Sequence, residues 1–81
     1  MFYVYILQSL KNSSYYIGYT EDLNERLAMH NAGRVKGTKY RRPFIIVYTE
    51  VYNIATEARK REFYIKRQKS RKFIESLINK R

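Results

Sequence analysis

The chain has 81 residues, which allows one domain spanning residues 1–81, and its 44% hydrophobic content excludes disorder as the general state. It contains no cysteine, which excludes disulfides and thiolate metal sites. Seventeen Lys and Arg against seven Asp and Glu give a net charge of +10. Such a charge attracts polyanions, so nucleic acid is the expected partner, ahead of an anionic membrane or a merely solubilising surface.

The first residues of the chain are apolar but do not predict a signal peptide or a membrane span. Residues 1–7 lack a basic flank and a small-residue cleavage site, so they indicate a strand. No apolar run in the chain approaches the ~20 residues that cross a bilayer. We therefore expect a cytoplasmic protein that makes no membrane contact.

Two β-rich segments at the start of the chain predict an antiparallel hairpin. Residues 2–8 and 15–20 are rich in aromatic and β-branched types, and a polar turn separates them. Gly18 inside the second segment indicates a close backbone approach or a bulge. A third strand is expected over residues 44–52, directly after Pro43.

A first helix is expected between the second and third strands. Thr20 can cap it, and it opens with the acidic residues Glu21 and Asp22, which suit the positive end of the helix dipole. The sequence Asn-Ala-Gly ends it near Asn31. Residues 34–42 then form a basic loop.

Two further helices are expected after the third strand. Asn53 can cap a helix over residues 54–69, and Ser70 can cap a short final helix with an apolar stripe that includes Phe73 and Leu77. The order is then β-β-α-β-α-α. This order predicts an α+β fold, with a small three-stranded antiparallel sheet flanked by helices.

Polar residues stand on the apolar faces of two predicted helices. Arg26 and His30 fall beside Leu23 and Leu27 on the first helix, and their spacing of four residues lets them act on one object. On the second helix, Glu62 lies four residues after Ala58, inside a stripe completed by Ile54, Ile65 and Lys69. The neighbouring residues, in contrast, indicate a solvated basic surface: Arg59, Lys60 and Arg61.

Each of these polar residues also has a structural interpretation. Glu62 can pair with Arg26 in a half-buried salt bridge, which would offset the cost of its burial. His30 can serve as a capping or packing histidine. Arg26 can pack its stem and extend its head to solvent. Three such exceptions in so short a chain favour a functional site, although the pattern leaves both interpretations open.

The residues named so far resemble the GIY-YIG nucleases, and in particular the small stand-alone branch with a URI-type domain. Residues 3–5 (Tyr-Val-Tyr) and 16–18 (Tyr-Ile-Gly) are similar to the two signature tripeptides, although Tyr3 stands where the family name has Gly. The similarity extends to four later segments: 22–27, 30–31, 40–43 and 57–62. It covers residues 2 to about 69.

The resemblance implies metal-dependent hydrolysis of phosphodiester bonds, with Mg²⁺ or Mn²⁺ held by Glu62. It implies that Arg26 contacts the scissile phosphate. Tyr16 would help to deprotonate the attacking water, which requires cationic neighbours because phenols ionise only well above neutral pH. Tyr5 would position the water or the phosphate, and His30 would share the base role or bind phosphate.

Further residues enter through the same resemblance. Gly18 would leave space beside Tyr16. Phosphates along the substrate would meet three residues of the basic loop: Lys39, Arg41 and Arg42. The primary hypothesis is an endonuclease acting on DNA rather than RNA, including branched or damaged forms. The alternatives are a non-catalytic nucleic-acid-binding module and a protein associated with ribosomal RNA.

Overall fold

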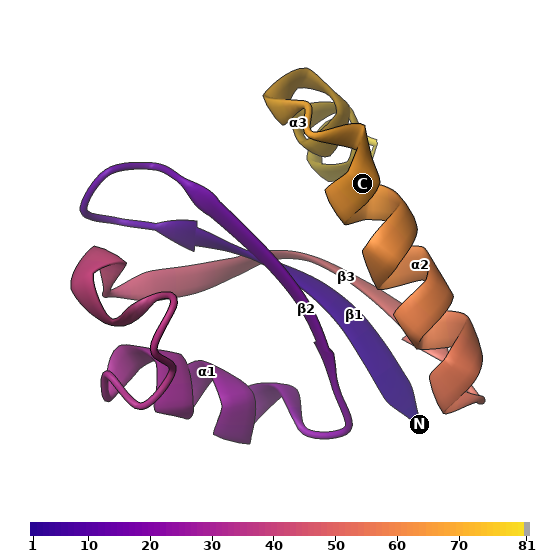
Figure 1. Ribbon diagram of the computed structural model, residues 1–81, viewed down its shortest axis with the longest axis horizontal. Helices are drawn as coiled ribbons and strands as arrows, with labels where there is room; N and C mark the ends of the chain where they lie inside the picture. Colours follow the sequence, from indigo (N-terminus) through magenta and orange to yellow (C-terminus); the bar gives the residue numbers. More distant parts are fainter. Residues whose placement is uncertain (81) are drawn as a thin grey trace.

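The computed structural model describes residues 1–80, and its elements follow the order predicted from the sequence (Figure 1). The strands are β1 (Phe2–Ser9), β2 (Tyr15–Thr20) and β3 (Phe44–Tyr52). The helices are α1 (Leu23–Asn31), α2 (Ala55–Gln68) and α3 (Arg71–Asn79), and a 3₁₀ turn, η1 (Lys39–Arg41), lies in the basic loop. The predicted α+β fold is confirmed.

The three strands form one antiparallel sheet with β1 at its centre, in the order β2-β1-β3. The pairing of β1 with β2 places Tyr5 opposite Gly18, which confirms the predicted hairpin. The irregularity in the sheet lies between β1 and β3, where Ile6 pairs with Tyr48 and Leu7 pairs with Ile46. Gly18 itself therefore does not mark a bulge.

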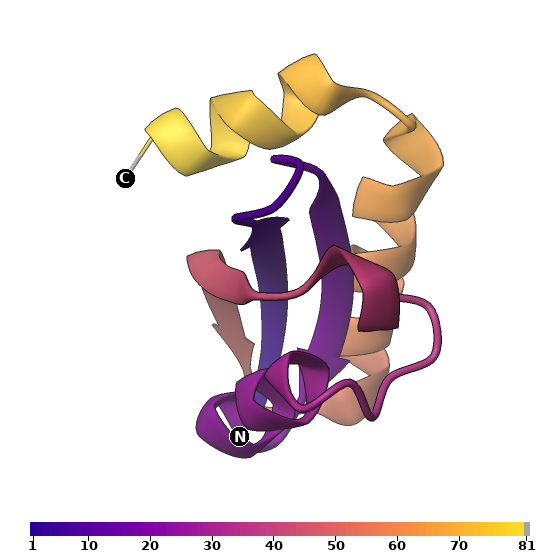
Figure 2. The ribbon, with the colours of Figure 1, turned by 90° about the vertical axis from the view of Figure 1, so that its left-hand side faces the viewer.

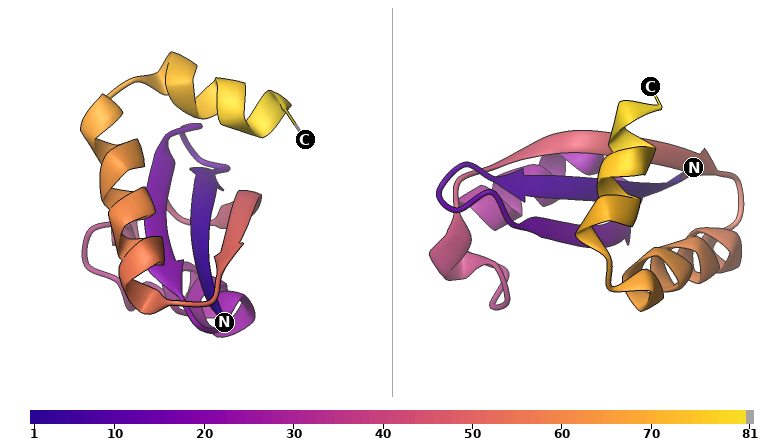
Figure 3. Two further views of the ribbon diagram at one scale, coloured as in Figure 1. Left: turned by 90° about the vertical axis from the view of Figure 1, so that its right-hand side faces the viewer. Right: turned by 90° about the horizontal axis from the view of Figure 1, so that it is seen from above.

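Side chains of the central strand alternate between two apolar layers, as the period of a strand requires. Val4 and Ile6 are buried against residues of α2 and α3. Tyr5 and Leu7 are buried on the opposite face, against Phe44 and residues of α1. Figures 1 and 2 show α1 and α3 on opposite sides of the sheet, and Figure 3 shows α3 crossing the strands. Every residue of β1 between 4 and 7 therefore lies in a core.

Several helix ends differ from the predicted ones by one or two residues. Helix α1 begins after Asp22, whose carboxylate accepts from the Glu25 backbone N–H at 3.0 Å. The Thr20 hydroxyl instead accepts from the backbone N–H of Asp22 at 3.1 Å and forms a turn before the helix. Asp22 reaches the orphan amides of the first turn more directly because it is closer to them.

The second helix is also shorter than expected. The N-cap position of α2 is Ile54, which makes no side-chain capping bond, so the predicted cap at Asn53 is wrong. At the other end Lys69 adopts the left-handed conformation with φ of 46° and stops the helix at Gln68. The predicted cap at Ser70 is confirmed, because its hydroxyl accepts from the Phe73 backbone N–H at 3.1 Å.

None of the helices within residues 1–80 has the length and apolar character needed to cross a membrane. The apolar stripe predicted for the final helix, α3, packs on the sheet. Ile74 and Leu77 are buried there, and Phe73 and Ile78 are partly buried.

Candidate active site

Gly18 is required because the ring of Tyr5 lies across its Cα. A Cβ built on Gly18 would meet the Tyr5 hydroxyl at 2.5 Å and the ring carbon Cζ at 2.7 Å. Any side chain at position 18 would therefore displace the phenol. The space left by Gly18 is taken by Tyr5, whereas the sequence led us to expect it beside Tyr16.

Tyr5 forms a buried hydrogen-bonded chain with His30 and Thr38. The Tyr5 hydroxyl lies 3.1 Å from His30 Nε2, and His30 Nδ1 lies 2.8 Å from the Thr38 hydroxyl. Thr38 donates its own proton to the Val35 carbonyl at 3.3 Å. Its oxygen must therefore accept from Nδ1–H, which leaves Nε2 as the acceptor of the Tyr5 proton.

The environment keeps both Tyr5 and His30 neutral at pH 7. Burial and the charge of Tyr16 raise the pKa of Tyr5 above its ordinary value, as does the carboxylate of Glu62, while Arg26 opposes them. Burial and the positive charges of Arg26 and Arg41 lower the pKa of His30 to about 4. A neutral imidazole and a protonated phenol are the forms that the hydrogen-bonded chain requires.

Tyr16 lies next to this chain but is more accessible. Its ring centroid is 4.8 Å from that of His30 and 6.4 Å from that of Tyr5. The Lys66 ammonium lies 5.9 Å from the Tyr16 ring centroid. Within residues 1–80 the Tyr16 hydroxyl makes no hydrogen bond to protein, so it is available to water or substrate.

Glu62 reaches the site from α2 and keeps access to solvent. Its side chain is 17% exposed and pairs with Lys66 at 2.9 Å, one helical turn away. It also lines a surface hollow of about 410 Å³ on α2. No ion pair joins Glu62 to Arg26 anywhere in the described residues, so the salt bridge considered from the sequence does not form.

Arg26 completes the group from α1. It is half-buried, and its positive charge lowers the pKa of both Tyr5 and His30. The structure thus brings together side chains from four elements: Tyr5 of β1, Tyr16 of β2, Arg26 and His30 of α1, and Glu62 of α2.

The donor set fits a divalent ion that binds few protein groups. No group of three or more His, Asp or Glu residues that could hold a metal occurs within residues 1–80. Glu62 is instead a single solvent-accessible carboxylate beside a cationic surface. Magnesium accepts such a site, because it retains several waters and takes its remaining oxygens from a substrate phosphate.

The basic loop contains two kinds of arginine. Arg41 is half-buried, and its guanidinium donates to the Ser14 hydroxyl at 2.9 Å and to the Gly37 carbonyl at 3.1 Å. Arg41 therefore holds the loop against the β1–β2 turn while its charge acts on His30. Lys39 and Arg42 are exposed, and the Arg42 guanidinium also donates to the Lys39 carbonyl at 3.1 Å.

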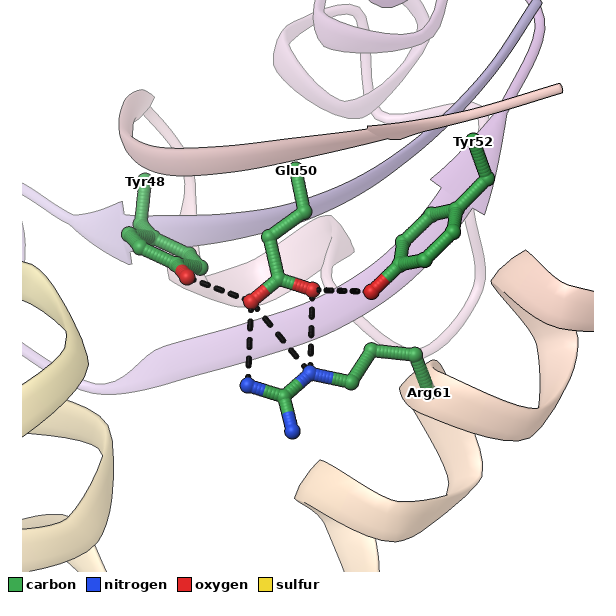
Figure 4. A network of polar contacts seen from close by, with 4 residues as sticks. All are labelled: Tyr48, Glu50, Tyr52 and Arg61. Atoms are coloured by element: carbon green, nitrogen blue, oxygen red, sulfur yellow. Dashed lines mark hydrogen bonds and ion pairs between the residues drawn. The ribbon is translucent and has the colours of Figure 1, made fainter.

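A second polar cluster was missed in the sequence. Glu50 on β3 accepts from Arg61 on α2 at 2.9 and 3.0 Å and from the hydroxyls of Tyr48 and Tyr52 (Figure 4). Burial alone would raise the pKa of Glu50, but these hydrogen bonds outweigh it and the net pKa is lowered. Arg61 is thus not part of a solvated surface, contrary to our expectation.

The sequence does carry a signal for this cluster. Tyr48, Glu50 and Tyr52 alternate along β3, so they share one face of the strand. Arg61 and Glu62 are adjacent on α2, and they point to opposite flanks of the buried stripe that holds Ala58. The Glu50–Arg61 pair therefore anchors α2 on one flank while Glu62 faces the site on the other.

Comparisons with known proteins show to which family the chain is similar. The GIY-YIG catalytic domain family matches residues 1–75. UPF0213 protein SH2523 of Staphylococcus haemolyticus is 47% identical over 77 residues, which cover 90% of this chain and 93% of that protein. A UPF0213 protein of Staphylococcus saprophyticus is 45% identical over 76 residues, covering 89% of this chain and 92% of the relative.

A solved structure gives the same result. The solution NMR structure of the UPF0213 protein BH0048 from Bacillus halodurans superposes with a TM-score of 0.60 at 38% identity. The similarity covers 98% of this chain and 84% of that one. The chain belongs to the GIY-YIG catalytic domain family, whose members are in general endonucleases.

Proposed function

We propose that this protein is a metal-dependent endonuclease that hydrolyses phosphodiester bonds of DNA, including branched or damaged forms, in the cytoplasm. The observation that carries the proposal is that Tyr16, Arg26 and Glu62, from three different elements, all act electrostatically on Tyr5 of a fourth element, while Glu62 keeps access to solvent. A carboxylate repels nucleic acid, so a module that only binds would gain nothing from Glu62 at this place.

Tyr16 is the group that meets the attacking water. Its hydroxyl is not bonded to protein within residues 1–80, and the Lys66 ammonium lies 5.9 Å from its ring centroid. Tyr5 is held by His30 and keeps its proton, so its role is to orient the water or a phosphate oxygen. His30 is fully buried and acts through Tyr5 as a positioning residue.

Arg26 binds the scissile phosphate, because a guanidinium donates two parallel hydrogen bonds to phosphate oxygens and its charge offsets the charge that develops during hydrolysis. Glu62 would hold Mg²⁺ or Mn²⁺, and the ion would supply positive charge that offsets the negative charge of the phosphate and the leaving oxygen. In the structure Lys66 forms an ion pair with the Glu62 carboxylate, and it would move toward a phosphate when the ion binds. Exposed Lys39 and Arg42 hold the flanking backbone, and Arg41 adds charge from within the loop.

The test is nicking of plasmid DNA and of branched DNA with Mg²⁺ or Mn²⁺, with RNA as a comparison substrate. We expect Glu62→Gln and Arg26→Ala each to lower the rate by ~10²-fold or more, as expected for groups that stabilise charge in the transition state. Glu57→Gln, on the exposed part of α2, is the matched control and should cut normally. Binding without cutting under every divalent ion would instead identify a non-catalytic module.

A further inference from the structure

An exposed aromatic side chain directly follows the candidate metal ligand. Phe63 is 61% exposed, although an aromatic ring of this size is normally covered in a folded domain. It lines the hollow of about 410 Å³ on α2 together with Glu62, so the ring and the carboxylate border one surface. An isolated exposed apolar residue needs no explanation, but one that borders the proposed reaction site does.

The surroundings of the ring determine what can cover it. The other residues of the hollow are Thr56, Arg59 and Lys60, all exposed and two of them cationic. The Arg67 guanidinium carbon lies 5.6 Å from the Phe63 ring centroid. An apolar protein surface would leave these cations without partners on binding. A nucleotide satisfies both features, since its phosphate pairs with the cations and its base stacks on the ring.

We propose that Phe63 is a stacking platform for one unpaired base next to the scissile phosphate, which would make unpaired or splayed strands the preferred substrates of this site. The inference rests on the proposed function, because it takes Glu62 as the point where the scissile phosphate is held. A base within an intact duplex is covered on both faces by its neighbours, so it cannot reach the ring without being unstacked.

The absence of tryptophan from the chain allows a direct measurement. In Phe63→Trp the new indole is the sole one, and a base that stacks on it quenches its fluorescence. We expect a base-bearing single strand to quench strongly, and an abasic strand of equal length and charge to quench little. A blunt duplex should also quench little. Ile54→Trp, at the exposed N-cap of α2, is the control and should respond equally weakly to all three.

Binding affinity gives the second measurement. Phe63→Ala should lose affinity for a single strand by roughly 5- to 150-fold, the range for one base–aromatic stack, and Phe63→Tyr should retain it. Equal quenching by the abasic and the base-bearing strands would overturn the proposal, as would equal binding by the alanine and tyrosine variants. Quenching needs no catalysis, so nicking can fail while the platform is confirmed, or proceed while it is refuted.

Discussion

The close contact between Gly18 and the Tyr5 ring can be tested by adding a single carbon atom at position 18. In Gly18→Ala the added Cβ would displace the Tyr5 ring, so we expect a loss of roughly 1–3 kcal/mol in the free energy of unfolding and a slower nuclease. Gly37→Ala is the control, because a Cβ there meets nothing within 4 Å. Urea denaturation of both variants measures the difference, and equal stabilities would contradict the assigned contact.

His30 predicts how stability depends on pH. Its pKa is lowered from 6.5 to about 4 by burial and by Arg26 and Arg41, so between these values the unfolded chain binds a proton that the folded chain does not. The contribution of neutral, buried His30 to the free energy of unfolding is therefore complete above about pH 6.5. It is lost as the pH falls toward 4, by roughly 3 kcal/mol in all.

The measurement compares the wild type with His30→Gln by urea denaturation from about pH 4.5 to about pH 7.5. This range covers most of the interval between the folded and the unfolded pKa of His30. The stability advantage of the wild type should shrink as the pH falls, while other acidic groups such as Glu50 affect both proteins alike. A difference between the two proteins that is independent of pH would show that folding does not lower the pKa of His30.

At this scale the sequence indicated which residues are anomalous but not how they are paired. The apolar stripes singled out Arg26, His30 and Glu62, yet they could not show that His30 is bonded through both nitrogens. The pairing of Glu62 with Lys66 could have been predicted from the sequence, because Lys66 follows Glu62 by four residues, the spacing of a favourable helical ion pair. The contact of Gly18 with Tyr5 depends on strand register, which the sequence did not fix.

Helix α2 is joined to β3 by the Glu50–Arg61 ion pair. Glu50 and Arg61 are largely buried, with side-chain exposures of 17% and 29%, and share bidentate hydrogen bonds. A double-mutant cycle with Glu50→Ala and Arg61→Ala should give a coupling of about 1–3 kcal/mol in the free energy of unfolding.

The exposed pair Arg71–Glu75 on α3 is the control for that cycle. Its side chains are 53% and 46% exposed, so its coupling should stay below about 0.5 kcal/mol. If the two pairs couple equally, the Glu50–Arg61 pair does not anchor α2. Loss of this anchor should also slow nicking, because α2 carries Glu62.

Element types and order were predictable because the apolar periods of the strands and helices are clear and the turns are polar. The exact helix ends were not, because Thr20, Glu21 and Asp22 are all acceptable near a helix start and only geometry selects among them. The anchor from β3 to α2 was not foreseen, since it joins two faces whose relative placement depends on the whole fold.

For the whole molecule, the net charge of +10 predicts binding that weakens steeply with salt, because bound phosphates release counterions. Lys39→Gln and Arg42→Gln should each reduce the slope of log affinity against log salt by about one. Arg71→Gln on α3, which removes a cation already paired with Glu75, should leave the slope nearly unchanged. Titration by fluorescence anisotropy checks this, and a flat salt dependence would exclude phosphate contacts as the source of affinity.

The assembly of the site from β1, β2, α1 and α2 has a consequence during synthesis on the ribosome. When all three strands and α1 have emerged from the ribosome, the nascent chain carries Tyr5, Tyr16 and Arg26 but still lacks Glu62. It also lacks the helix that covers Val4 and Ile6. The ability to cut would therefore arise only after α2 has emerged and docked on the sheet, so a partly synthesised chain would be inactive.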